Sequence, residues 1–320
     1  AAQMLPASLT PGPAFDRLCG ACLGATLGGG YIVHGGFFLG PRDFYQTLRD
    51  MPAPQKLRIN MSRIRFINEL LGHEELARLQ RKDARFINTT MMVTLLGAAV
   101  SDGLDSGQIV SGVGGQYNFV AMGHALPDAR SILLLHAWRS HHGKVTSNII
   151  WNYAHTTIPR HLRDMVITEY GVADLRGQAD VEVIKRLLAI ADSRFQDELL
   201  ATAKMNGKVE LEYEIPQAQR NNRPEVIEAR LQRWHDAGLL PDFPLGTDFT
   251  DDELVVVGAL TRLQHSAEHP LELVKLLLDV TMGQALGHKE VPGRYLERLG
   301  LQDAHGLKDR LMRALFVGNL

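Results

Sequence analysis

Short apolar runs bounded by glycine, asparagine, aspartate or proline recur through the first two-thirds of the chain. Each has the length of a strand and is rich in Ile, Val, Leu or aromatic residues, which is typical of buried strands. The runs are 31–39, 57–61, 108–110, 131–137, 149–153 and 165–168. Helical patterns lie between several of them, at 41–49, 61–71 and 89–101. Strands alternating with helices predict an α/β fold with a mostly parallel open sheet and flanking helices.

The clearest helical periodicity lies in the region 180–206, where apolar residues recur every three or four positions. Asp180 is placed to cap the start of this helix, and Asn206 with Gly207 supplies its stop. Beyond Gly207 the chain becomes polar and then helical again, at 224–237, 251–266 and 270–284. Thr250 and Glu253 take capping-box positions before the second of these helices.

This change of pattern predicts two parts. We expect an α/β domain over residues 1–206 and a mainly helical C-terminal extension over residues 207–320. The chain length of 320 residues suffices for two such parts.

The composition excludes several classes of function. With 34 Lys plus Arg against 36 Asp plus Glu, the formal net charge is −2, which gives no electrostatic basis for binding nucleic acid or an anionic membrane. Two cysteines cannot form a disulfide framework, so we expect a reducing, cytoplasmic location. The 30 glycines exceed the usual share of about 7% and indicate tight turns where the backbone closely approaches another group.

The uncharged stretch 18–41 is long enough to span a bilayer. It contains eight glycines and His34, so a buried, glycine-rich α/β segment is favoured over a lipid-facing helix. Within it, Cys19 and Cys22 have the spacing of a redox dithiol or half of a zinc site. Since no second cysteine pair accompanies them, we interpret the two thiols as small apolar filler and predict no metal site.

The glycine loop at 111–115 is the sharpest chemical feature of the sequence. Three glycines within four residues follow an apolar run, and such a loop exposes successive backbone N–H groups that can cradle a phosphate or stabilise an oxyanion. The dinucleotide fingerprint would need glycine at position 117, which is Tyr117. A tight structural turn remains the alternative.

Two charged residues are further candidates. Glu169 directly follows the apolar run 165–168, and the carboxyl end of a strand faces the ligand crevice in open α/β sheets. Its carboxylate is a candidate nucleophile or base, against the alternative of an ion pair with an arginine. The arginines in question are Arg160, Arg163 and Arg176. Lys144 follows Gly143 and is either a point charge for a phosphate or a solvated side chain.

Several motifs together resemble the C-terminal domain of the acetyl-CoA hydrolase/transferase family, a branch of the family I CoA-transferases. The resemblance covers residues 30 to 205 and rests on five segments, 84–88, 111–119, 143–145, 157–160 and 166–177. It implies an α/β CoA-transferase fold. It also implies transfer of coenzyme A between carboxylic acids, or hydrolysis of acyl-CoA, through a glutamyl-CoA thioester.

On this resemblance, coenzyme A and acyl-CoA are substrates, and no cofactor is permanently bound. The second substrate is a carboxylate. The implied CoA-contacting residues are Gly112, Gly114, Gly115, Gln116 and Lys144.

The sequence departs from the family pattern at the nucleophile. The family's glutamate lies in a Ser/Thr-Glu-hydrophobe context upstream of the glycine loop, whereas the stretch before Tyr31 contains no glutamate, and Gln3 stands at the nearest equivalent. An amide cannot attack a thioester as a carboxylate does. The N-terminal α/β domain of the family is also not recognisable, which predicts a fragment or one subunit of a split enzyme. Assembly into a homo-oligomer is a separate expectation. The alternatives are an inactive CoA-binding module and an assembly subunit.

Overall fold

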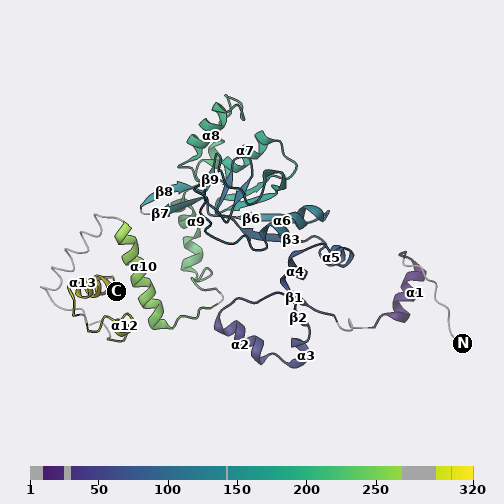
Figure 1. The fold of residues 1–320 in the computed structure, drawn as a ribbon, viewed down its shortest axis with the longest axis horizontal. Coiled ribbons are helices and arrows are strands. Elements are labelled where there is room, and N and C mark those ends of the chain that lie inside the picture. The colour runs from purple at the N-terminus through teal and green to yellow at the C-terminus, as the bar shows by residue number, and fades with distance from the viewer. Residues whose placement is uncertain are drawn as a thin grey trace. The chain divides into compact units, whose positions relative to one another are not determined.

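The computed structural model describes residues 10–24, 30–141, 143–244, 246–268, 293–303 and 305–319 (Figure 1). Gln3 and the predicted helix 270–284 lie outside the described residues. The chain divides into two compact units, residues 1–68 and 69–320. The boundary predicted near residue 206 stays a prediction.

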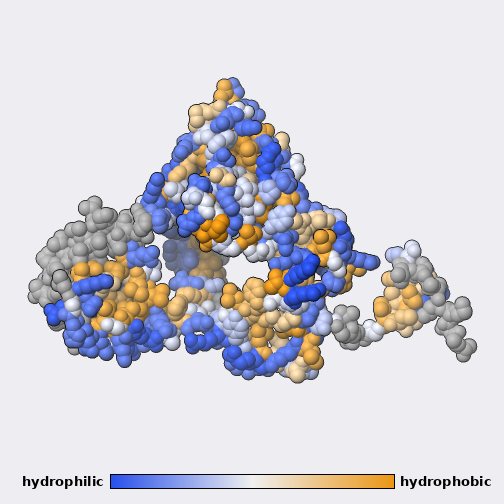
Figure 2. All heavy atoms as spheres, in the orientation of Figure 1, coloured by the Kyte–Doolittle hydropathy of each residue, from blue (hydrophilic) through white to orange (hydrophobic). Residues whose placement is uncertain are grey.

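The first unit is built from short elements. They are α1 (Pro13–Cys22), β1 (Val33–Gly35), α2 (Arg42–Asp50), α3 (Ala53–Lys56), β2 (Ile59–Met61) and α4 (Ile64–Asn68). The strands β1 and β2 fall inside predicted runs and pair in parallel. The described residues of this unit include no fully buried side chain, and Figure 2 shows hydrophobic surface around α2 and α3. Phe37, Leu39 and Leu57 are each at least 70% exposed.

The second unit contains a four-stranded sheet in the order β11-β10-β6-β3. Three strands run in parallel, and β11 adds an antiparallel edge. The bounds are β3 (Arg85–Thr89), β6 (Arg130–Leu134), β10 (Met165–Thr168) and β11 (Gly171–Asp174). The sheet confirms the predicted α/β class with a mostly parallel sheet. The β10 strand matches its predicted run, whereas the apolar runs did not include β3 or β11.

Helices cover one face of this sheet. The register places Asn88, Leu133, Val166 and Ala173 side by side on the same face. The main core lies there and includes the apolar side of α7 (Asp180–Ala189), which packs on α8 (Gln196–Met205). A smaller apolar cluster joins α6 (Gln116–Ala125) to Phe86 on β3, and α5 (Glu74–Gln80) precedes β3.

The predicted helix at 89–101 is wrong. This segment forms β4 (Met92–Thr94) and β5 (Ala99–Val100), an antiparallel pair that β9 (Ile149–Ile150) joins in parallel. Gly97 makes the turn with φ +87°, a backbone conformation that glycine adopts readily. All residues of β4 and β5 are buried, so the apolar run is a pair of strands buried on both faces, which shows no alternation.

Three other local predictions need correction. The run 108–110 makes only an isolated bridge, between Gly103 and Ile109. The region 180–206 is two helices rather than one, because the chain leaves the helix at Ile190 and restarts at Gln196. Asp180 does not cap α7, since the cap position is Ala179 and makes no side-chain bond. The predicted stop holds, with Gly207 at φ +63°.

Beyond Asn206, the described residues form helices at the predicted positions 224–237 and 251–266. These are α9 (Pro224–Asp236) and α10 (Asp251–Glu268), and α12 (Gly293–Arg298) and α13 (Leu307–Gly318) follow them. The capping box before α10 is confirmed, because the backbone N–H of Thr250 donates to Glu253 Oε2 at 2.7 Å and the Glu253 N–H donates to Thr250 Oγ1 at 3.4 Å. A small core holds Val256, Leu296 and Phe316.

We predict that Leu187→Ala lowers the free energy of unfolding by about 2–5 kcal/mol, because Leu187 is fully buried in the main core. Urea denaturation of the full chain measures this change. Met205→Ala is the matched control at a helix residue that is 79% exposed, and it should change stability by less than about 0.5 kcal/mol. Equal losses in the two variants would contradict the placement of the core.

Candidate functional site

The carboxyl ends of β3, β6 and β10 meet at one edge of the four-stranded sheet, because the three strands are parallel. This edge is the position at which open α/β sheets bind ligands. Gln116, the first residue of α6, donates from Nε2 to the carbonyl oxygen of Thr89 at 3.1 Å. Thr89 is the last residue of β3, so this bond fixes the N-terminus of α6 and the glycine loop before it at the edge.

The glycine loop is exposed from Ser111 to Gly114 and leads into α6 through its cap residue Gly115. Gly114 has φ +60°, which side chains disfavour, and a Cβ atom built on Gly112 or Gly114 would meet nothing within 4 Å. The cap makes no side-chain hydrogen bond, which leaves first-turn N–H groups open to a ligand. Open space beside unpaired N–H groups is the arrangement that binds anions.

Two buried polar atoms lie next to this loop without a partner in the described part of the chain. They are Nδ2 of Asn88, near the end of β3, and Oε1 of Gln116. Buried polar groups are normally hydrogen-bonded, so this strand end holds one donor and one acceptor without a partner among the described residues. Sequence reasoning did not select Asn88 as a site residue. The signal that the sequence offered for Asn88 was a polar side chain at an alternate position of a strand, where an apolar residue is usual.

Asp102 anchors the start of the loop. Its carbonyl oxygen accepts the N–H groups of Val110 at 2.8 Å and Ser111 at 3.2 Å. Its carboxylate accepts a bond from Thr157 Oγ1 and another from His155 Nε2 at 2.9 Å. The bond from Thr157, followed by that from His155, holds the pKa of Asp102 below its usual value. The glycine loop, through the Asp102 carbonyl oxygen, and the segment around residue 155, through the Asp102 carboxylate, are therefore tied together at one residue.

Glu169 lies at the same edge, just beyond the last residue of β10. Its Oε2 accepts the backbone N–H of Ala137 at 2.9 Å, which joins the β10–β11 turn to the chain leaving β6. The three arginines considered as ion-pair partners have other carboxylates. Arg160 and Arg163 bind Asp180, and Arg176 binds Asp164.

The turn that carries Glu169 is held rigidly by its neighbours. Thr168 Oγ1 donates to the carbonyl oxygen of Ile190 at 2.8 Å, and Tyr170 donates its hydroxyl proton to Asp192 Oδ2 at 2.9 Å. Burial, together with the bond to the Asp192 carboxylate, raises the pKa of Tyr170, so the phenol stays a donor. The position of Glu169 is thus fixed by residues on both sides.

Lys144 does not join this group. It is exposed at the start of β8 (Lys144–Ser147), which pairs with β7 (Trp138–His141) in a hairpin. The hairpin leaves the sheet edge at Ala137, and its four-residue strands place Lys144 roughly 13 Å away at about 3.3 Å per residue. The structure therefore brings the glycine loop, Gln116 and Glu169 to one edge and sets Lys144 apart from them.

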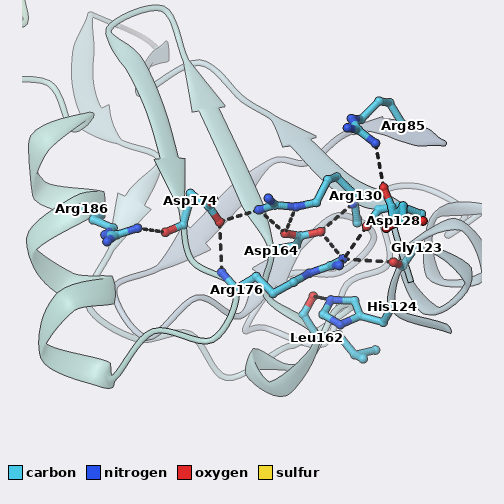
Figure 3. A network of polar contacts seen from close by, with 12 residues as sticks. Arg85, Gly123, His124, Asp128, Arg130, Leu162, Asp164, Asp174, Arg176 and Arg186 are labelled. Carbon is cyan, nitrogen blue, oxygen red and sulfur yellow. Dashed lines mark hydrogen bonds and ion pairs between the residues drawn. The ribbon is translucent and has the colours of Figure 1, made fainter. Parts of the chain in front are cut away.

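The opposite edge of the sheet holds a network that sequence reasoning missed. Asp164 is 1% exposed and accepts bonds from Arg130 Nε at 2.8 Å, from the Ser131 N–H at 2.7 Å and from Arg176. Figure 3 shows Asp164 between the two guanidiniums. Bonds to Asp164 and then Asp174 raise the pKa of Arg130. The network joins the amino ends of β6 and β10.

The cysteine pair and the uncharged stretch 18–41 both lie in the first unit. Cys19 and Cys22 are both free thiols on α1, and Cys22 is exposed. Within the described ranges, no group of three or more potential metal ligands comes together. The uncharged stretch 18–41 is not one helix, since α1 ends at Cys22 and β1 begins at Val33. None of the described helices is long and apolar enough to cross a bilayer.

Comparison with known proteins gives a family match and several relatives. The family model for the acetyl-CoA hydrolase/transferase C-terminal domain matches residues 40–203. A probable butyrate:acetyl-CoA coenzyme A-transferase of Syntrophomonas wolfei is 29% identical over 53% of this chain, and a 4-hydroxybutyrate coenzyme A transferase of Clostridium kluyveri is 26% identical over 51%. The chain spans 36% of the length of each relative.

Solved structures give a similar extent of match. The crystal structure of RipA from Yersinia pestis shares 29% identity, with a TM-score of 0.45, over 55% of this chain and 37% of that protein.

We predict that neutralising Asp102 changes how stability depends on pH. The pKa of Asp102 in the folded protein is lowered from an unfolded value of about 3.9. The carboxylate therefore stabilises the fold above that value, and this stabilisation is lost as the pH falls through the folded-state pKa. The advantage of the wild type over Asp102→Asn should shrink on acidification, as urea denaturation at a series of pH values would record. Asp105→Asn, which neutralises an exposed carboxylate nearby, controls for net charge. A pH-independent difference for Asp102→Asn would contradict the assignment.

Proposed function

The chain belongs to the acetyl-CoA hydrolase/transferase family, and from this membership we propose that it forms the thioester-binding part of an acyl-CoA:carboxylate CoA-transferase or acyl-CoA hydrolase. The activity would proceed through a glutamyl-CoA thioester. Coenzyme A and its acyl thioester are the proposed substrates, with a carboxylate as the second substrate in transfer.

The observation that carries this proposal is the open glycine loop at the carboxyl edge of the sheet. Gly112 and Gly114 border free space, and Gly115 leads into an uncapped helix N-terminus. Such N–H groups suit the oxyanion that forms when a thioester carbonyl is attacked.

The proposed chemistry has two covalent steps. A carboxylate attacks the acyl-CoA carbonyl, the C–S bond breaks, and CoA leaves as a thiolate while a mixed anhydride forms. The thiolate then attacks the glutamyl carbonyl and expels the acyl group as a free carboxylate, which leaves a glutamyl-CoA thioester. An acceptor carboxylate attacks the glutamyl-CoA thioester, and the same steps in reverse give a new acyl-CoA and the free glutamate. Attack by water instead gives free CoA and the free glutamate.

We propose that Glu169 is a positioning residue and that the nucleophile comes from another part of the complete enzyme. The Glu169 carboxylate already holds the Ala137 N–H at 2.9 Å. The sequence before Tyr31 contains no glutamate, and Gln3 has no nucleophilic carboxylate. A second candidate function follows from the same observation, namely a CoA-binding or assembly module that performs no transfer.

The proposed partner is the remaining part of a CoA-transferase. The chain spans about a third of its curated relatives, so the rest of such an enzyme would supply the nucleophile and further CoA contacts. Lys144, exposed on the hairpin, belongs to the proposal as a point charge for a CoA phosphate. A cytoplasmic location and homo-oligomerisation remain expectations.

We predict that Gly114→Ala weakens CoA binding about tenfold, since it disturbs backbone donors to a charged ligand. Calorimetric titration of CoA into the full chain measures the affinity. Gly207→Ala is the matched control, because Gly207 has φ +63° against +60° for Gly114 and equally open surroundings. Both variants should lose similar stability from backbone strain, and only Gly114→Ala should lose affinity. Equal affinities in the two variants would remove the loop from the site.

We also predict that Glu169→Gln leaves covalent chemistry unchanged, because an amide oxygen can still accept the Ala137 N–H. The protein, with any co-purified partner, is treated with acetyl-CoA, and the glutamyl-CoA thioester is trapped with borohydride or hydroxylamine. The intact mass of each chain is then measured by mass spectrometry. The expected adduct lies on the partner and is equal for wild type and Glu169→Gln. An adduct on this chain that disappears in Glu169→Gln would make Glu169 the nucleophile. CoA binding without any adduct would favour the non-catalytic module.

A further inference from the structure

A charged depression of about 390 Å³ lies at the amino end of β10, away from the glycine loop. It is formed by the segment that enters β10, the turn before α7 and the C-terminal half of α6. β10 is four residues long, so the depression stands roughly 13 Å from Glu169 along the strand, at about 3.3 Å per residue. We call it the arginine pocket, and its charged and titratable lining is Arg160, Arg163, Arg176, Asp180, His124 and His161.

The lining carries an excess of positive charge. Three guanidiniums face a single carboxylate, that of Asp180. Arg160 Nη1 binds both Asp180 oxygens, at 2.8 and 2.9 Å, and Arg163 Nη1 binds Oδ1 at 2.9 Å. These bonds, that from Arg163 first, hold the pKa of Asp180 below its usual value. Two arginines therefore share one carboxylate, and the third, Arg176, pairs with the buried carboxylate of Asp164, which does not line the pocket.

The pocket retains donors that no acceptor uses. Arg160 is 54% exposed, and its bonds to Asp180 involve Nη1 alone. The Nε atom of Arg176 is buried and has no hydrogen-bond partner in the part of the chain that the structure describes. A guanidinium presents five N–H donors in a planar fork. Because the Arg176 Nε atom is buried, the donors that an external anion can reach are those of the exposed Arg160 other than Nη1.

The arginines are also held in place before any ligand arrives. Arg163 donates to the carbonyl oxygens of Leu96 at 2.9 Å and Gln178 at 2.7 Å. Arg176 donates to those of Ala129 at 2.8 Å and Gly123 at 3.0 Å, and Figure 3 shows it running between Asp164 and the His124 ring. Side chains ordered in advance lose less entropy when they bind. The N-terminus of α7, at Asp180, adds a favourable dipole for an anion.

We propose that the arginine pocket binds a phosphate dianion, either as inorganic phosphate or as the phosphate monoester of a larger ligand. A phosphate offers more charge and more acceptor oxygens than a carboxylate, and it can engage several guanidiniums at once. The pocket is separate from the proposed thioester site, so the two sites can be tested independently.

The test is a calorimetric titration of inorganic phosphate into the full chain at constant ionic strength. Arg160→Ala, which removes a mostly exposed side chain, should weaken binding about tenfold. Asp180→Asn should strengthen binding, because it removes the internal competitor for Arg160 and Arg163. Arg220→Ala is the matched control, since Arg220 also forms a peripheral ion pair, with Asp197 at 2.8 Å, and it should leave binding unchanged.

The proposal is overturned if the wild type takes up no phosphate, or if Arg160→Ala and Arg220→Ala bind it equally well. If Asp180→Asn fails to fold, the comparison of the two arginine variants still decides the matter. Gly114→Ala should leave phosphate binding intact, so failure of the thioester site is recognised separately.

Competition identifies the source of the phosphate. Displacement of bound phosphate by CoA but not by dephospho-CoA would assign the pocket to the 3′-phosphate of CoA. Absence of displacement by either would assign it to a phosphate compound other than CoA, and both results support the site. Displacement of phosphate by dephospho-CoA but not by CoA would contradict a phosphate-monoester site.

Discussion

The buried carboxylate of Asp164 is the contact on which the arrangement of the sheet depends. It accepts hydrogen bonds from the guanidiniums of Arg130 and Arg176 and from the backbone N–H of Ser131, at the amino ends of β6 and β10 (Figure 3). Removing one partner of a buried ion pair leaves an uncompensated charge, which destabilises proteins by about 3–5 kcal/mol. Because Arg176 also reaches the carbonyl oxygen of Gly123, the same carboxylate positions α6 against the sheet. Helix, strands and turn are therefore fixed by one set of charges.

The Asp164 network stabilises the amino ends of the strands, whereas the candidate binding groups lie at their carboxyl ends. At that edge, single hydrogen bonds place each candidate group, from Gln116 to Thr89 and from Ala137 to Glu169. Three of the five residues of the glycine loop have no side chain, and a Cβ atom built on Gly112 or Gly114 would meet nothing within 4 Å, so the space beside the loop backbone is open. Rigid strands beneath an open loop are the usual basis of a preorganised binding site.

Sequence patterns predicted β10, the helices α9 and α10 and the capping box at Thr250 correctly, because each depends on local periodicity or on residues three apart. The same patterns made a helix of 89–101, where burial on both faces hides the period of two. The pattern also joined α7 to α8 across Asp192, a buried residue whose partners are Tyr170 and Arg194. Non-local contacts of that kind leave no periodic signal.

The sequence by itself determined the α/β class and the glycine loop, since these follow from residue types at local spacing, and its motifs carried the resemblance to the family. Tertiary structure decided which charges meet. Glu169 was compatible in sequence with three arginines, yet the parallel strands place it beside Ala137, while Asp180 and Asp164 take those arginines at the other edge. The reason is geometric, because strand direction assigns residues to one edge of a sheet or the other, and a linear sequence does not specify which strands are neighbours.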